Sequence, residues 1–121
     1  MQRRIVHRLL RLSRPEFDTL VREALGALPQ WVRERLENVT VAVEDVPPPG
    51  EPRDTLGLYV GGSIFADDAF APPPMVLLFQ RPHERLCRTR AQLRREIART
   101  VLHEVAHHFG LEETDLESLG L

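Results

Sequence analysis

The chain has 121 residues, the size of one domain, and 42% of them are apolar, enough for a single core. Its 16 basic and 18 acidic residues leave a net charge of −2, which argues against nucleic acid or an acidic membrane as a partner. The single cysteine, Cys87, excludes an internal disulfide, and no apolar run is long enough to span a bilayer. Because no secretory signal is recognisable, we expect a cytoplasmic protein.

A helix is predicted directly after an arginine-rich N-terminus. We expect a single domain over residues 1–121, with residues 1–14 as a flexible basic arm; the alternative is an N-terminus partly docked on the domain. Ser13 is suited to cap a helix, Pro15 to occupy its first turn and Glu16 to lie at its positive end. Apolar residues then follow at helical spacing: Phe17, Leu20, Val21, Ala24, Leu25 and Leu28.

A second, shorter helix is predicted over residues 30–37. Gly26 and Pro29 end or bend the first helix, and Pro29 also suits the first turn of the next one. We expect the apolar residues of this second helix to face the core: Trp31, Val32 and Leu36.

Three stretches are predicted to form a small sheet. Residues 39–43 and 56–60 alternate in the manner of strands, and Gly61 ends the second of them. Residues 75–79 are wholly apolar, which is typical of a central strand buried on both faces. Residues 63–65 are a further candidate strand.

After Pro82 the chain is expected to turn helical, and residues 90–109 are predicted to form one long helix with a broad apolar face. Gly110 is placed to end it in a left-handed conformation, and residues 115–119 add a last turn. The predicted fold class is therefore α+β: N-terminal helices, a small mixed or antiparallel sheet, and a long C-terminal helix packed on it.

The long helix contains the sequence His103-Glu104-Val105-Ala106-His107. Residues four apart on a helix lie on one face, so the imidazoles of His103 and His107 can share a metal ion. Glu104 is rotated about a third of a turn from them, within reach of a metal-bound water. This is the arrangement of a zinc hydrolase, in which Glu104 acts as the general base. A helix that merely presents polar residues to solvent is the alternative.

A third ligand is expected from the acidic residues that follow Gly110. A catalytic zinc site needs three protein ligands, and the spacing after His107 favours Glu113. Glu112 and Asp115 are alternatives, although Asp115 is also placed to cap the last turn or to orient a ligand histidine. His108 can reach Glu104 or a substrate, but an exposed histidine near the helix end is the stronger interpretation.

Several other residues have both functional and structural interpretations. His7 and His83 have no partner at metal-ligand spacing, so we interpret them as structural or surface residues, and Cys87 as an inert thiol. Residues 58–60 and 63–65 are candidate edge strands for holding an extended peptide. Tyr59 can stabilise an oxyanion through its hydroxyl, but a partly exposed strand residue is the stronger interpretation.

Three segments together resemble the minimal metalloprotease (minizincin) family of zincin-like bacterial proteins. They are TVLHEVAHHFGLEETDLESLG over residues 100–120, LGLYVGG over 56–62 and PPMVLLFQRP over 73–82. The resemblance implies a truncated zincin in which His103 and His107 bind zinc, Glu104 is the catalytic acid/base and Glu113, or less favourably Asp115, is the third ligand. It departs from the larger metzincins, which have a third histidine where this chain has Glu113 and a methionine turn downstream.

The sequence thus predicts a zinc-dependent metallopeptidase-like hydrolase that acts on peptides or unfolded proteins. The alternative is a non-catalytic, zinc-containing module, derived from a peptidase, that binds peptides or proteins. Two histidines and a carboxylate also suit Fe(II), but the His-Glu-x-x-His spacing favours Zn²⁺.

Overall fold

A computed structural model describes residues 10–61, 73–106 and 110–121. The first helix, α1 (Arg14–Gly26), begins as predicted, because Ser13 and Glu16 form a capping box at its N-terminus. Residues ahead of it are docked: Leu12 is buried, and its N–H donates to the carboxylate of Glu84. The predicted basic arm over residues 1–14 therefore does not extend to Leu12 and Arg14, and residues 1–9 lie outside the described part of the chain.

The second helix, α2 (Gln30–Arg35), is shorter than the predicted span and turns only part of its apolar set inward. Val32 is fully buried, whereas Trp31 is 40% exposed. The prediction for Trp31 was wrong: its ring lies under the guanidinium of Arg35, 5.7 Å away, in a cation–π contact at the surface.

Three strands form one mixed sheet in the order β1-β3-β2. Strand β1 (Thr40–Glu44) pairs parallel to β3 (Met75–Phe79), and β2 (Gly57–Val60) pairs antiparallel to β3 on its other side. The apolar run is thus the central strand, as predicted. It is not buried equally on both faces: Val76 and Leu78 are fully buried, while Met75 and Leu77 are half-buried. The candidate strand over residues 63–65 lies outside the described residues.

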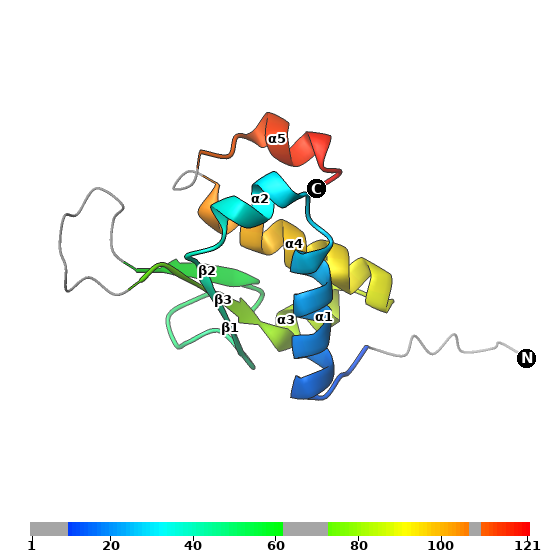
Figure 1. Ribbon diagram of the computed structural model, residues 1–121. Coiled ribbons are helices and arrows are strands. Elements are labelled where there is room, and N and C mark those ends of the chain that lie inside the picture. The colour runs from blue at the N-terminus through cyan, green and yellow to red at the C-terminus, as the bar shows by residue number, and fades with distance from the viewer. Residues whose placement is uncertain (1–9, 62–72, 107–109) are drawn as a thin grey trace, which may run out of the picture.

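Two helices follow the sheet directly. Helix α3 (Gln80–Leu86) begins at once after β3 and tolerates Pro82 because that residue lies in its first turn, where no backbone N–H is needed. Helix α4 (Arg90–Val105) then packs on β2, β3 and α1 (Figure 1). Its inward residues complete the core with those of α1 and β3: Leu93, Ile97, Ala98, Val101, Leu102 and Val105.

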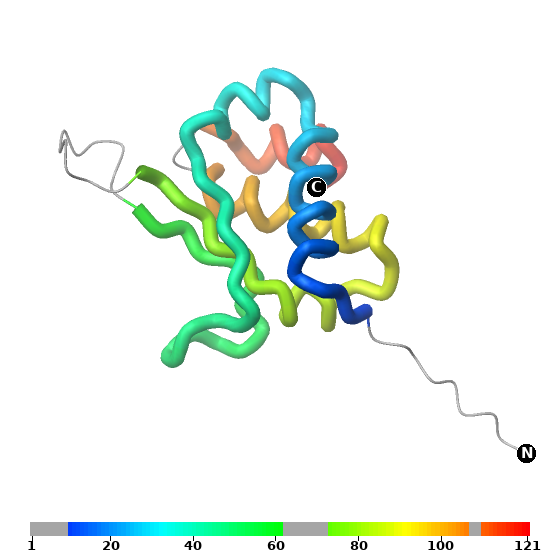
Figure 2. The backbone as a smooth tube through the Cα atoms, turned by 60° about the horizontal axis from the view of Figure 1, so that its bottom comes forward, coloured from blue at the N-terminus to red at the C-terminus, as the bar shows by residue number. Residues whose placement is uncertain are grey.

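The C-terminal segment ends in α5 (Glu113–Ser118), which buries Leu116 in the same core. The Arg35 side chain of α2 donates to the carbonyl oxygen of Gly110 at 2.9 Å, which ties this segment to α2. Figure 2 shows the chain running from α2 along β1, at one edge of the sheet, to the loop before β2. The molecule is therefore α+β, with α4 packed against both the sheet and α1. Among the described residues, no helix is long and apolar enough to cross a membrane.

Candidate metal and catalytic site

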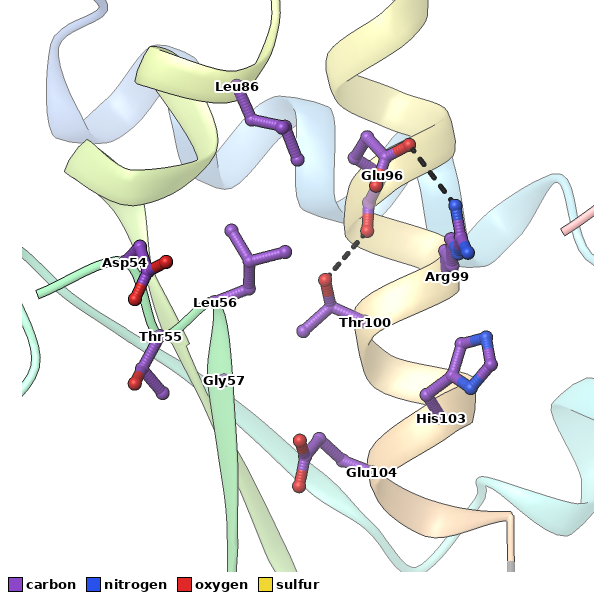
Figure 3. A pocket seen from close by; sticks show the side chains of 10 residues that line it. All are labelled: Asp54, Thr55, Leu56, Gly57, Leu86, Glu96, Arg99, Thr100, His103 and Glu104. Atoms are coloured by element: carbon purple, nitrogen blue, oxygen red, sulfur yellow. Dashed lines mark hydrogen bonds and ion pairs between the residues drawn. The ribbon is translucent and has the colours of Figure 1, made fainter. Parts of the chain in front are cut away.

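The C-terminal half of α4 brings two of the predicted site residues to one surface of the molecule. Thr89 caps the start of the helix by accepting a hydrogen bond from the Gln92 N–H at 3.1 Å. The apolar face of α4 is buried in the core, and His103 and Glu104 lie at the margin of that face. His103 is exposed and Glu104 is half-buried. Figure 3 shows Glu104 directed toward β2, with His103 turned the other way.

The carboxylate of Glu104 is held by the backbone of β2. Its Oε2 accepts a hydrogen bond from the Tyr59 N–H at 3.1 Å. The Phe79 N–H donates to the Leu56 carbonyl, which fixes which backbone groups of β2 point toward β3. Because these groups alternate in direction along a strand, the N–H and C=O groups of Gly57 and Tyr59 point to the outer edge of the sheet. Glu104 therefore lies at the hydrogen-bonding edge of β2.

Gly57 allows this contact because it has no side chain. A Cβ atom at Gly57 would lie 2.7 Å from Thr100 Cγ2, 3.0 Å from the Leu77 carbonyl oxygen and 3.7 Å from Glu104 Cγ. Any larger residue would force α4 and β2 apart. A glycine inside an apolar strand indicates a close backbone approach, and this is the sequence signal by which Gly57 could be recognised.

The surroundings of Glu104 favour its protonated form. Burial removes water from the carboxylate and raises its pKa above the ordinary value, and this outweighs the Tyr59 N–H and the nearby His103, which both lower the pKa. A carboxyl group shifted in this direction is better suited to exchanging protons near neutral pH than an exposed glutamate is.

A cavity of about 530 Å³ opens beside these two residues, between α4, the last residue of α3 and the start of β2. His103, Glu104 and Thr100 line it from α4, and Leu56 and Gly57 from β2. Figure 3 shows the side chains of Leu56 and Leu86 directed into the space in front of α4. The predicted acid/base and one predicted ligand thus border a space that can admit another molecule.

The second predicted ligand, His107, and His108 lie outside the described residues, and so does His7. The described helix ends at Val105, with Ala106 as its C-cap, and the last residues of the predicted helix, 107–109, lie outside the described part of the chain. Gly110 has φ +67°, and the Leu111 N–H donates to the Ala106 carbonyl at 2.9 Å. A glycine in the left-handed conformation, followed by an N–H that donates to the carbonyl five residues earlier, is the arrangement expected where a helix ends.

The acidic residues after Gly110 have different surroundings. Glu113 is the exposed first residue of α5. Asp115 accepts a hydrogen bond from the Glu112 N–H at 2.8 Å and forms a capping box with Glu112. The carboxylates of Glu112 and Asp115 are thus engaged in ending the loop before α5.

The described donors suit a first-row metal ion but form only part of the predicted set. Within these residues, no three His, Cys, Asp or Glu side chains are grouped to hold a metal ion. Because His107 lies outside the described residues, the ligands that can be located in the structure are His103 and an acidic residue. His103 fits the role of a ligand: it is an exposed imidazole that lines the cavity beside Glu104.

His83 is a structural residue, as expected, and it contacts Thr100, one of the residues that line the cavity. It is fully buried, with Nδ1 2.8 Å from the Phe79 carbonyl oxygen and Nε2 2.9 Å from Thr100 Oγ1. Burial lowers its pKa, which favours the neutral ring. The contact joins α3 to α4 at the residue that packs against Gly57. Cys87 is also buried, and burial raises the pKa of its thiol to about 11, in agreement with an inert role.

Comparison with known proteins agrees with this geometry. The sequence profile of a family described as zincin-like metallopeptidases matches residues 36–121, which include β1 to α5 and all the predicted site residues. The chain belongs to the zincin-like metallopeptidase family. Membership in this family implies a zinc-binding protein related to peptidases. No curated protein matches the chain significantly.

A solved structure supports the fold over nearly the whole chain. A conserved hypothetical protein from T. thermophilus superposes with a TM-score of 0.54 and 25% identity, covering 89% of this chain and 97% of that one. The similarity extends beyond the zincin-like metallopeptidase match, so it also includes part of the N-terminal helices ahead of residue 36.

Proposed function

We propose that this zincin-like protein is a zinc-dependent metallopeptidase that cleaves peptides or unfolded proteins, with Glu104 as the general base. The hydrogen bond from the Tyr59 N–H to Glu104 supports the proposal most directly, because it puts a half-buried carboxylate at the outer edge of β2 and beside a cavity. An extended peptide pairs with such an edge through its main chain. Gly57 lies close to the same side chain, since a Cβ atom there would be 3.7 Å from Glu104 Cγ.

The proposed ligands are His103, His107 and Glu113, with Asp115 as the alternative third ligand. The capping hydrogen bond that Asp115 accepts from Glu112 favours Glu113, whose side chain is exposed. A zinc ion held by these ligands would act as a Lewis acid, lowering the pKa of water and polarising a carbonyl. Glu104 then takes the proton of the attacking water and passes it to the leaving amine.

Elemental analysis and one substitution test the proposal. Protein purified without added metal is expected to carry close to one zinc per chain. Glu104→Gln is expected to keep that zinc and lose peptide cleavage, measured by mass spectrometry on a peptide mixture. Glu37→Gln, which changes an exposed glutamate after α2, is the matched control and should cleave as the unmodified protein does.

Three results would count against the proposal. Unchanged cleavage by Glu104→Gln would remove the assigned general base. Zinc and peptide binding without cleavage by the unmodified protein would instead favour the non-catalytic peptide-binding module. Absence of zinc, with none taken up on dialysis, would contradict both functions.

A further inference from the structure

The backbone at Gly110, between α4 and α5, is held by a side chain of α2. The Arg35 guanidinium donates from Nη1 to the Gly110 carbonyl oxygen at 2.9 Å. A Cβ atom at Gly110 would lie 3.1 Å from the same Nη1, so the guanidinium lies close against the glycine. Figure 1 shows α2 beside the end of α4 and below α5. A charged donor makes a stronger hydrogen bond than a neutral one, so Arg35 restrains the backbone at this point.

The Arg35 side chain is oriented by its own helix. Trp31 lies one turn before Arg35, and the guanidinium carbon is 5.7 Å from the centroid of the Trp31 ring. Stacking on an aromatic face restricts the orientation of a planar guanidinium as well as its position. Val32 is fully buried and anchors α2 in the core. The exposed Trp31 ring therefore limits the motion of Arg35 relative to the rest of the domain.

Gly110 leads directly to the proposed third ligand. Leu111, the next residue, is buried, and its N–H donates to the Ala106 carbonyl at 2.9 Å. Glu113 follows two residues later as the first residue of α5. A helix of six residues is not stable by itself, so the position of Glu113 depends on the segment before it and on Leu116 in the core. Arg35 restrains that segment three residues before Glu113.

This contact comes from a part of the chain that the family match does not include. Trp31 and Arg35 lie ahead of residues 36–121, which the zincin-like metallopeptidase profile matches. The match therefore covers the proposed ligands but not α2. A purely stabilising contact would affect the melting temperature alone, whereas a contact that positions a ligand would also affect the affinity for the metal.

Resting on the proposed function, we propose that Arg35, oriented by Trp31, is a positioning residue for the zinc site. Its hydrogen bond to Gly110 holds the segment before α5 in the arrangement from which Glu113 joins the histidine ligands of α4. Zinc binding then does not have to order this segment, and a site that is ordered in advance binds more tightly.

The zinc affinity of the full-length protein measures this role without turnover. Metal-free protein competes with a chromophoric chelator for Zn²⁺, well below the melting temperature. Arg35→Ala should weaken zinc binding about tenfold, the lower end of the effect of residues that support metal ligands. Trp31→Ala removes only the ring under the guanidinium and should weaken it about two- to fivefold. Arg33→Ala, which changes an exposed arginine of the same helix, is the matched control and should bind as the unmodified protein does.

A double-mutant cycle separates positioning from general stability. Glu113→Ala removes the proposed ligand and should itself weaken zinc binding. In that background Arg35→Ala should cost less than about threefold, because the ligand that it positions is gone. Equal losses with and without Glu113 would overturn the proposal. Circular dichroism of the metal-free variants checks that each is folded and gives its melting temperature.

The outcomes distinguish this role from the peptidase proposal. Weaker zinc binding by Arg35→Ala that depends on Glu113 supports the positioning role even if the unmodified protein cleaves no peptide, a result that would refute only the peptidase activity. Peptide cleavage by the unmodified protein, with equal zinc affinities for Arg35→Ala and Arg33→Ala, would refute the positioning role and leave the peptidase standing. A lower melting temperature of Arg35→Ala with unchanged zinc affinity would show that Arg35 only stabilises the fold, and would also overturn the proposal.

Discussion

Gly57→Ala tests the contact on which the candidate site depends. The new methyl group would lie 2.7 Å from Thr100 Cγ2 and 3.0 Å from the Leu77 carbonyl oxygen, where ordinary contacts are about 3.5–4.0 Å. One of these neighbours belongs to α4 and the other is backbone of β3. The strain therefore cannot be relieved by turning a flexible side chain, and β2 must move away from α4.

Forcing an extra methyl group into such a contact costs about 1–3 kcal/mol. For a chain of this length, 1 kcal/mol corresponds to roughly 4 °C in Tm, so we expect Tm to fall by about 4–12 °C. The same movement would lengthen the 3.1 Å bond from the Tyr59 N–H to Glu104. Turnover, where present, should fall on the order of tenfold or more with zinc content unchanged, because a displaced base is poorly aligned.

Thermal unfolding followed by circular dichroism measures the stability change, with Gly26→Ala as the control. Gly26 has no atom within 4 Å of its added Cβ and lies at the end of α1, so alanine there should stabilise the protein by about 0.4–1 kcal/mol. Adding Thr100→Ser to Gly57→Ala removes the closest methyl group, keeps the hydroxyl near His83, and should restore part of the loss. A Gly57→Ala protein as stable as the unmodified one would refute the close approach of α4 to β2.

Three further predictions concern groups away from the catalytic edge. Because burial puts the folded-state pKa of His83 below its ordinary value of 6.5, the unfolded chain binds a proton first as the pH falls. The free energy of unfolding should therefore decrease as the pH falls below about 6.5. In urea titrations between pH 7 and 5, the His83→Gln protein should show a weaker dependence on pH, and an unchanged dependence would contradict this prediction. The Cys87 thiol, with a pKa of about 11 against 9.0 for an ordinary cysteine, should react with iodoacetamide roughly a hundredfold more slowly in the folded protein than in urea, and equal rates would show that it is accessible. Ser13→Ala removes one side of the α1 capping box and should cost about 1 kcal/mol, or about 4 °C in Tm, which a calorimetric scan would detect.

Local sequence patterns predicted correctly those features of the secondary structure that depend on residues close together in the chain. Ser13 and Glu16 mark the start of α1 because a cap depends on residues three apart. The apolar run over residues 75–79 identified the central strand, and Gly110 took the left-handed conformation expected at a helix end. The family match over residues 36–121 agrees with the family that the His-Glu-x-x-His segment and its neighbours indicated.

Local sequence patterns were less informative where tertiary packing determines whether an apolar side chain is buried or exposed. Trp31 has an apolar ring, but α2 lies where Arg35 can cover that ring at the surface. Met75 and Leu77 are as apolar as their neighbours, yet α4 covers only one face of β3. Pro82 was expected to precede the helix, and instead it lies in the first turn of α3.

By itself the sequence determined the elements, the α+β class and the presence of an acid/base flanked by candidate ligands on one helix, because these depend on spacing along the chain. Only the tertiary structure decided that Glu104 meets the Tyr59 N–H, 45 positions away, and that Leu86 and Leu56 face one cavity beside it. Such contacts depend on how closely α4 approaches β2, and that distance is set by the absent side chain of Gly57 and by the core behind α4. No period along the chain encodes it.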